Sequence, residues 1–305
     1  MTMNPTRRRH DEQQIARLDR PVALSPLFRM GEGKEVKYRT QFTYDGDPVE
    51  IEITSRTTLG ATEQDVLLAI EQIASTKGFR LETGGKIAIE TTAAAILRAL
   101  NDKHEGGREF GRVKEAVEKL ASVTVKVEKK QSSGRYKPVC IDNLISLIGD
   151  QDGKLVIRIH PVFGHIIRGG SGYIQIDLKE RMRLDSTGRI LHAVVCSTVN
   201  RGSTGRMLIG SLCQRTWGDP RPLARRKEAL NHFFDEIEKM GWTATVERPE
   251  GRKASSGDPV VFVRPAAKPV KSPSGLPARR LRPTTQPINN AVPDEIDIEN
   301  EPCPF

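Results

Sequence analysis

The order of predicted elements constrains the fold most, because the same order occurs in both halves of the chain. In each half, shorter helical segments precede a longer helix with basic residues, and this helix runs directly into alternating strands. In the first half the helix covers residues 108–120 and the strands 123–127 and 136–141. In the second half the helix covers residues 223–240 and the strands 243–246 and 260–263. A helix, helix, basic helix, hairpin order is typical of winged helix-turn-helix domains, so we expect an α+β fold with tandem winged helix-turn-helix domains.

Two terminal segments fall outside this pattern. Residues 1–26 form a polar segment that contains Arg7, Arg8 and Arg9, and we expect a flexible, disordered basic arm. Residues 266–305 contain eight prolines, which excludes helix and predicts a disordered, Pro-rich C-terminal tail. We interpret the tail as a solvated linker, with phosphate contact by its basic part and a protein partner for its acidic part as alternatives. The first winged-helix domain, with an N-terminal hairpin, then covers residues 27–176, and the second covers residues 177–265.

Hydrophobic periodicity gives the remaining elements. Alternating apolar residues predict a hairpin over 36–42 and 49–53, closed by the turn residues Asp45 and Gly46. Helical spacing predicts a helix from Thr62 to Gly78 and further helices over 91–100, 162–167, 186–198 and 207–217. Strands are expected at 155–159 and 173–176. Both predicted domains therefore contain helices and antiparallel strands.

Charge and cysteine usage narrow the class of protein. The chain has 48 Lys and Arg against 39 Asp and Glu, a net charge of +9, so polyanions are natural partners. Its four cysteines are far apart and form no CxxC pair, so we expect reduced thiols in the cytoplasm and neither a zinc cluster nor a disulfide framework. A polar N-terminus and the absence of 18 consecutive apolar residues predict a protein that is neither secreted nor bound to a membrane.

Basic residues on the two longer helices are the candidate DNA contacts. Arg108, Arg112 and Lys119 share one face of the first helix, although neighbouring glutamates dilute the charge and an ordinary solvated face is the alternative. The second helix is the stronger candidate, because four cations crowd its first turns, where the helix dipole also favours phosphate. These residues are Arg221, Arg225, Arg226 and Lys227.

The predicted wings are basic as well. Lys129, Lys130 and Arg135 lie on the first hairpin, and Arg252 and Lys253 lie on the second. Side chains at such positions bind the phosphate backbone and carry little sequence information. We therefore expect DNA contacts from two helices and two wings.

Catalytic motifs are missing from the sequence. There is neither a GxxxxGK[ST] phosphate loop nor an HExxH metal motif. His160 and His165 have no third ligand nearby, and the paired histidines of a nicking enzyme do not occur. We therefore expect a protein without a cofactor or metal that is not an enzyme. The functions that stay open for a DNA-binding protein of this kind include a winged-helix transcriptional repressor of its own operon, a nuclease or nicking relaxase, and a protein-interaction scaffold.

Short motifs in a fixed order resemble one known family, the iteron-binding replication initiators (RepC) of IncQ-type broad-host-range plasmids. The motifs span about residues 27–247 and are Leu27-Phe28-Arg29, Thr43-Tyr44-Asp45-Gly46-Asp47, Leu59-Gly60-Ala61, Pro161 with Gly169-Gly170, Leu184-Asp185-Ser186, Leu191-His192, Leu212-Cys213 with Trp217, Arg225-Arg226, Glu228-Ala229-Leu230 and Gly241-Trp242-Thr243.

The resemblance implies a function as well as a fold. Family members bind direct repeats in double-stranded DNA at a plasmid origin, promote melting of an adjacent AT-rich segment and assist loading of a plasmid-encoded helicase. A plasmid-encoded primase acts afterwards. We expect the same partners here, with self-association as a further open question. Residues 77–107 match the family poorly, and residues after 264 have no counterpart.

Overall fold

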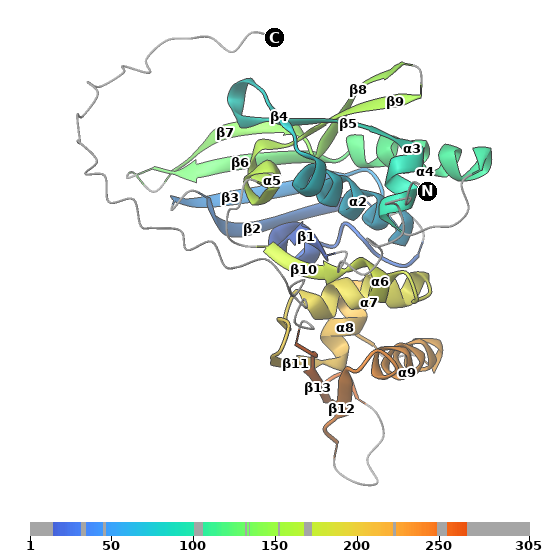
Figure 1. Ribbon diagram of the computed structural model, residues 1–305. Coiled ribbons are helices and arrows are strands. Elements are labelled where there is room, and N and C mark those ends of the chain that lie inside the picture. Colours follow the sequence, from blue (N-terminus) through green and yellow to red (C-terminus); the bar gives the residue numbers. More distant parts are fainter. Residues whose placement is uncertain are drawn as a thin grey trace, which may run out of the picture. The chain divides into compact units, whose positions relative to one another are not determined.

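A computed structural model describes most of the chain between residues 15 and 266 (Figure 1). The described residues are 15–31, 35–44, 47–100, 106–131, 133, 135–151, 153–167, 173–221, 224–248 and 255–266. All of these residues belong to one compact unit. The predicted disorder of the tail after residue 266 therefore lies outside the described residues.

The first four-stranded antiparallel sheet has the order β2-β3-β6-β7. β2 (Val36–Tyr44) pairs with β3 (Asp47–Ser55), and β3 pairs with β6 (Thr124–Lys130), which pairs with β7 (Tyr136–Asn143). The predicted hairpin over residues 36–53 is confirmed, and its turn residues Asp45 and Gly46 lie outside the described residues.

A second four-stranded antiparallel sheet has the order β4-β5-β9-β8. Its strands are β4 (Arg80–Leu81), β5 (Ile87–Thr92), β8 (Ile145–Gln151) and β9 (Lys154–Ile159), and the short η1 (Thr83–Gly85) joins β4 to β5. The predicted helix over 91–100 is wrong for its first two residues, which complete β5. The sequence analysis also missed β8, whose alternating pattern is interrupted by an irregularity between Leu147 and Gly149.

Four helices accompany these two sheets: α2 (Ala61–Lys77), α3 (Ala93–Ala99), α4 (Gly107–Ala121) and α5 (Pro161–Ile167). The helices that we expected from Thr62, from Arg108 and over 162–167 are confirmed. Twelve side chains of α2 are buried, which makes it the central helix of this half. α4 is strongly amphipathic, and its Val113, Val117 and Leu120 face the core.

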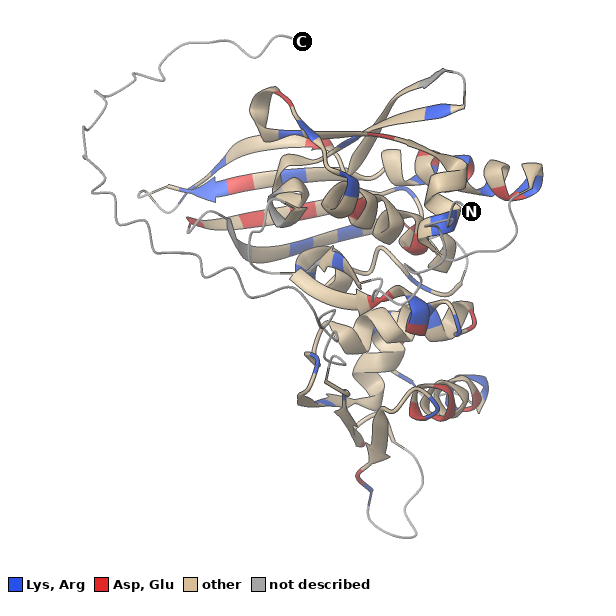
Figure 2. Cartoon of the chain, viewed as in Figure 1, with Lys and Arg blue, Asp and Glu red and all other residues tan. Residues whose placement is uncertain are grey.

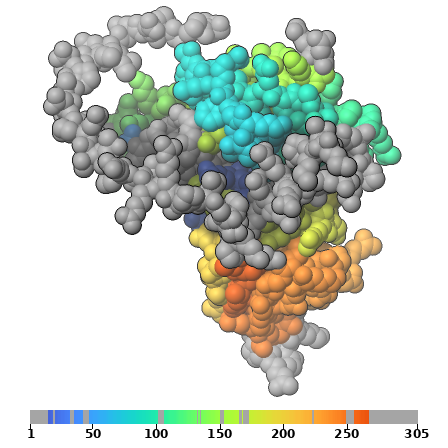
Figure 3. Space-filling model, in the orientation of Figure 1, coloured from blue at the N-terminus to red at the C-terminus, as the bar shows by residue number. Residues whose placement is uncertain are grey.

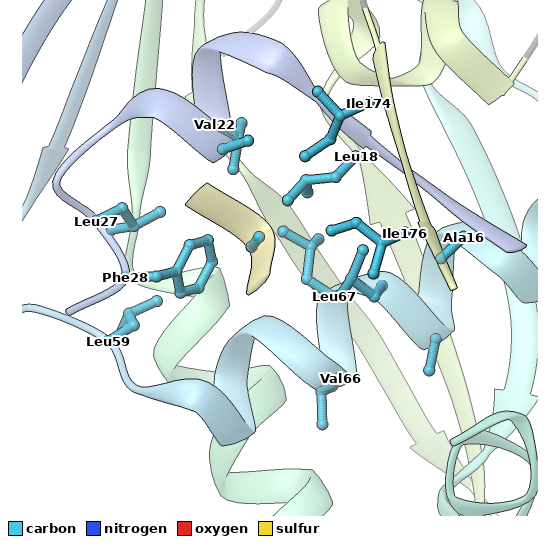
Figure 4. Close-up of a cluster of buried hydrophobic side chains, with 14 of the residues drawn as sticks. Ala16, Leu18, Val22, Leu27, Phe28, Leu59, Val66, Leu67, Ile174 and Ile176 are labelled. Carbon is cyan, nitrogen blue, oxygen red and sulfur yellow. The ribbon is translucent and has the colours of Figure 1, made fainter. Parts of the chain in front are cut away.

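The expected flexible arm over residues 1–26 is wrong for the described part of that segment. β1 (Ile15–Asp19) pairs antiparallel with β10 (Tyr173–Asp177), and α1 (Arg20–Leu24) follows it. Ala16 and Leu18 are fully buried. Figure 4 shows these N-terminal side chains, with Val22, Leu27 and Phe28, in one apolar cluster with α2 and β10. Hydrophobic burial therefore holds residues 15–28 in the fold.

The second half contains a smaller sheet with the order β11-β13-β12. Its elements are α6 (Leu178–Arg181), α7 (Ser186–Cys196), β11 (Thr204–Leu208), α8 (Ile209–Trp217), α9 (Ala224–Glu238), β12 (Thr243–Val246) and β13 (Pro259–Val263). The predicted pairing of strands 243–246 and 260–263 is confirmed. Helix α8 begins two residues later than predicted, because Met207 and Leu208 belong to β11.

The two halves differ in the number and arrangement of their sheets. In the second half a helix, a strand, two helices and two strands follow one another around one small sheet. The first half has two four-stranded sheets, and its β6–β7 hairpin extends the sheet that contains β3 rather than the one that contains β5. Both halves are thus mixed folds of helices and antiparallel sheets. Tandem winged helix-turn-helix domains stay a prediction.

A buried ionic network joins α2 to the first helices of the second half. Arg181 is fully buried, and its Nε lies 2.6 Å from Asp65 Oδ1, while its Nη2 donates to Gln64 Oε1 at 2.9 Å. Its Nη1 donates to the backbone oxygen of Arg189, whose own guanidinium lies 2.9 Å from Asp65 Oδ2. Breaking such a pair leaves an uncompensated buried charge, so this network fixes which surfaces of the two halves meet.

Candidate nucleic-acid interface

The turn that leads into α9 contains Arg221, one of the four cations predicted to contact DNA from the second helix. Asp219 accepts hydrogen bonds from the backbone N of Arg221 at 3.0 Å and from Arg221 Nη2 at 2.8 Å. Hydrogen bonds from Arg221 hold the pKa of this carboxyl group well below its usual range. Arg221 is thus a neutralised side chain in the free protein, although its guanidinium stays exposed.

Arg226 stabilises the same turn. Its Nη1 donates to the backbone oxygens of Arg221 at 2.8 Å and Asp219 at 3.3 Å, and it lies 3.2 Å from the Asp219 carboxylate. Its guanidinium also lies 5.7 Å from the centre of the Trp217 ring, and only 18% of its side chain is exposed. The turn itself depends on Gly218, which has a φ of 75° and ends α8 in the left-handed region. The Arg226 guanidinium is therefore occupied by contacts within the protein.

Arg225 and Lys227 complete the predicted cluster, and neither is paired with an acidic side chain of the described residues. Arg225 is exposed and Lys227 is half-buried, both in the first turn of α9. Farther along, the accessible residues of this helix are mostly acidic, namely Glu228, Asp235, Glu236 and Glu238. Figure 2 shows the mixed colouring of α9. Only the N-terminal turn of α9 thus offers a favourable surface to phosphate.

The sheet next to α9 carries paired charges. Arg206 of β11 lies 2.7 Å from Glu247, and the Arg248 guanidinium lies 2.7 Å from the buried carboxylate of Asp258. The predicted wing residues Arg252 and Lys253 lie outside the described residues. Their contribution stays a prediction.

The three predicted DNA-contacting residues of α4 have different surroundings in the structure. Lys119 Nζ lies 3.0 Å from Glu63 Oε1, and Glu63 Oε2 accepts the backbone N–H of Gly60 at 2.8 Å at the start of α2. Although burial would raise it, these hydrogen bonds hold the pKa of Glu63 below its ordinary value. Lys119 therefore joins α4 to α2, whereas Arg112 pairs with Glu109 at 2.7 Å and Arg108 is exposed.

The cations predicted for the first wing lie at the tip of the β6–β7 hairpin. Lys129 pairs with Asp47 at 2.6 Å, and Lys130 and Arg135 are exposed and form no ion pair with another described residue. Lys129, Lys130 and Lys137 line an open hollow at this tip together with Val139. Lysines around a shallow hollow suit the oxygens of a phosphate backbone.

These two basic regions of the first half lie at opposite ends of it. Figures 1 and 2 show α4 and β6 following one another in the same direction, with basic residues at the beginning of α4 and at the tip of β6. The sequence analysis predicted DNA contacts from both the helix and the hairpin, and the structure places their basic regions apart.

Metal sites and membrane-spanning helices were also considered for the described part of the chain. No three His, Cys, Asp or Glu side chains converge there as they do around a metal ion. His160 is buried, its Nδ1 accepts the backbone N–H of Val162 at 3.3 Å, and the side chain of His165 lies outside the described residues. Among the described helices none is both long and apolar enough to cross a membrane.

Comparison with solved structures identifies the fold. The crystal structure of selenomethionine derivatives of domains 2 and 3 of RctB is similar, with a TM-score of 0.51 and 11% identity, over 76% of this chain and 92% of that chain. A second crystal structure of RctB domains 2–3 covers 80% of this chain and 96% of that chain, with a TM-score of 0.48 and 12% identity. No curated protein matches the sequence. The first of these structures shows that the fold is similar to that of domains 2 and 3 of RctB.

The family follows from the sequence match. The family model for replication protein C (RepC) matches residues 87–252, which is more than half of the chain, and the protein belongs to this family. The resemblance predicted from short motifs is confirmed. The matched residues include α4, the β6–β7 hairpin and all of α9.

Proposed function

We propose that this protein initiates plasmid replication by binding direct repeats in double-stranded DNA at the origin. In this proposal it promotes local melting and assists the loading of a plasmid-encoded helicase, with a plasmid-encoded primase acting afterwards. Membership of the RepC family supports a role in replication. The observation that carries DNA binding is the position of Arg225 and Lys227 on the first turn of α9, where neither pairs with an acidic side chain among the described residues.

The order of elements around α9 supports its use as a recognition helix. α7, β11, α8, α9, β12 and β13 follow the helix, strand, helix, helix, strand, strand order of a winged-helix domain, and β13 lies between β11 and β12. In winged and other helix-turn-helix proteins, the N-terminal residues of the recognition helix contact base edges in the major groove. Arg225 and Lys227 stand at that position on α9.

The first half supplies a second and more extended contact in this proposal. Arg108 at the start of α4 and the lysines at the β6–β7 tip are far apart, so they reach different parts of the bound DNA. Contacts to separated phosphates position a protein and favour bending of the duplex between them. Bending by several protomers on adjacent repeats is a route to melting that requires neither a cofactor nor catalysis by this protein.

Fluorescence anisotropy with the origin direct-repeat duplex and a scrambled duplex of equal length tests the proposal. We expect affinity for the repeat to be higher by on the order of a thousandfold, with a steep dependence on salt. Equal affinity for both duplexes would contradict sequence-specific origin binding. Metal-dependent cleavage of either duplex would instead identify a nuclease.

Permanganate footprinting on a supercoiled origin plasmid separates an initiator from a transcriptional repressor. An initiator should make thymines in the AT-rich segment reactive when it binds the repeats. A repressor binds without opening the duplex, so protection of the repeats with no reactive thymines would favour that alternative.

A further inference from the structure

Two open hollows adjoin one another on the second sheet of the first half. The first is lined by the end of α2, the end of β5, α3 and the beginning of β9, and Lys77, Thr91, Arg98 and Lys154 are among its residues. The second is lined by the residues that follow α2 and by β5 and β9, with Phe79 among them. Lys77 and Glu90 line both hollows, so the two are direct neighbours, and together they are called here the β5 groove.

The β5 groove is basic. Lys77, Arg98 and Lys154 are exposed side chains from three different elements, and Glu90 is the one acid among the residues that line the groove. Neither Lys77 nor Lys154 forms an ion pair with an acidic side chain among the described residues. A fourth cation, Arg80, is neutralised by Glu82 at 3.0 Å. The groove thus presents a net positive surface to a ligand.

An exposed aromatic side chain lies at one end of the groove. Phe79 is 39% exposed and is the one aromatic among the large exposed apolar side chains of the described residues. It follows Gly78, whose φ of 92° ends α2 and turns the chain toward β4. A Phe ring beside lysines is the combination that binds bases by stacking and the backbone by charge.

Thr92 and Lys154 lie at the other end of the groove, where they pair across β5 and β9. Along β5 the groove runs from Ala88 to Thr92, about 13 Å, which accommodates a short stretch of single strand.

We propose that the β5 groove binds single-stranded DNA, with Phe79 stacked on a base and Lys77 and Lys154 on backbone phosphates. A duplex is a poorer occupant, because its bases are stacked on one another and offer no free face to a ring on the protein. None of the groove residues belongs to α9 or to the β6–β7 tip. The protein therefore has a surface for single strands that is separate from its proposed duplex contacts.

The use of this groove at a melted origin rests on the proposed function, but the contact itself is testable alone. Anisotropy with a fluorescent oligo-dT probe measures binding of the full-length protein, and the same samples are titrated with the repeat duplex. Phe79→Ala should weaken oligo-dT binding by about fivefold or more. Lys77→Ala with Lys154→Ala should lower the slope of log affinity against log salt by about 1.4, which corresponds to two single-strand phosphates.

Matched variants control for folding. Phe79→Trp keeps a stacking ring and should retain oligo-dT binding, and Lys77→Arg with Lys154→Arg should keep the salt slope. Arg225→Ala with Lys227→Ala should leave oligo-dT affinity unchanged while it weakens duplex binding. Unfolding temperatures of all variants are compared with that of the unaltered protein.

Three outcomes would overturn the inference. The first is no measurable oligo-dT binding, and the second is binding that neither the Phe79 nor the lysine variants change. The third is an oligo-rU probe that binds more tightly through the same residues, which would make the occupant RNA. Loss of duplex binding with retained oligo-dT binding would refute the proposed origin recognition and leave this groove in place.

Discussion

Arginine and lysine substitutions in one turn of α9 should separate DNA binding from folding. Arg225→Ala with Lys227→Ala removes two cations that have no acidic partner within the described part of the chain. Two phosphate contacts are worth about 1.8 in the slope of log affinity against log salt, and a guanidinium on a base edge adds about 1–3 kcal/mol. Because these are surface substitutions, the free energy of unfolding should change by less than about 0.5 kcal/mol.

Arg226→Ala should behave in the opposite way. Its guanidinium donates to the backbone oxygens of Asp219 and Arg221 and is only 18% exposed. Loss of such charge-assisted hydrogen bonds should cost about 2 kcal/mol of stability, or about 4–8 °C in Tm for a unit of this size. Part of the DNA affinity should fall with it, since the turn that positions α9 loosens.

Thermal unfolding followed by circular dichroism, together with anisotropy on the repeat duplex over a range of salt, measures both effects. Arg221→Ala is a useful control, because Arg221 is exposed and paired with Asp219 and should affect both quantities only slightly. The reasoning would be refuted by an Arg226→Ala protein with unchanged Tm and lost duplex binding. It would also fail if the Arg225 and Lys227 double variant kept its full salt slope.

Two further predictions concern stability. Arg181→Met should cost about 3 kcal/mol in urea unfolding, because Asp65 loses its fully buried partner and keeps only Arg189. A loss under about 1 kcal/mol would contradict a tight ionic network. His160 is buried, and burial lowers its pKa to about 4. Between about pH 6.5 and 4 the unfolded chain therefore binds a proton at this residue that the folded chain does not bind. The free energy of unfolding should fall as the pH falls through that range. The effect should approach about 3 kcal/mol and be missing in His160→Gln, as measured by chemical unfolding at several pH values.

Local patterns predicted the elements whose partners are near in sequence. The hairpin of β2 and β3 alternates clearly and closes over a short turn, and α4 and α9 show helical periodicity over several turns. β1 was missed because its two buried residues, Ala16 and Leu18, form too short an alternation in a charged segment. Its partner β10 lies more than 150 residues away, and no local signal reports such a pairing.

The candidate site could be predicted in composition but not in detail. A run of cations on α9 was visible in the sequence, yet charge counting cannot tell Arg225, which is unpaired, from Arg226, which the Asp219 turn engages. Lys119 was assigned to DNA because it shares a helix face with Arg108, although its partner Glu63 comes from another helix. The β5 groove was missed since its cations come from three separate elements.

The network of Arg181, Asp65 and Arg189 also bears on how relatives of this protein diverge. A chain that loses one of two buried opposite charges is strongly destabilised, whereas joint replacement by apolar residues of similar size is often tolerated. Positions 65 and 181 should therefore change together among family members, while exposed cations such as Arg225 are free to vary singly. Such a family could alter its proposed DNA contacts without disturbing the junction between its halves.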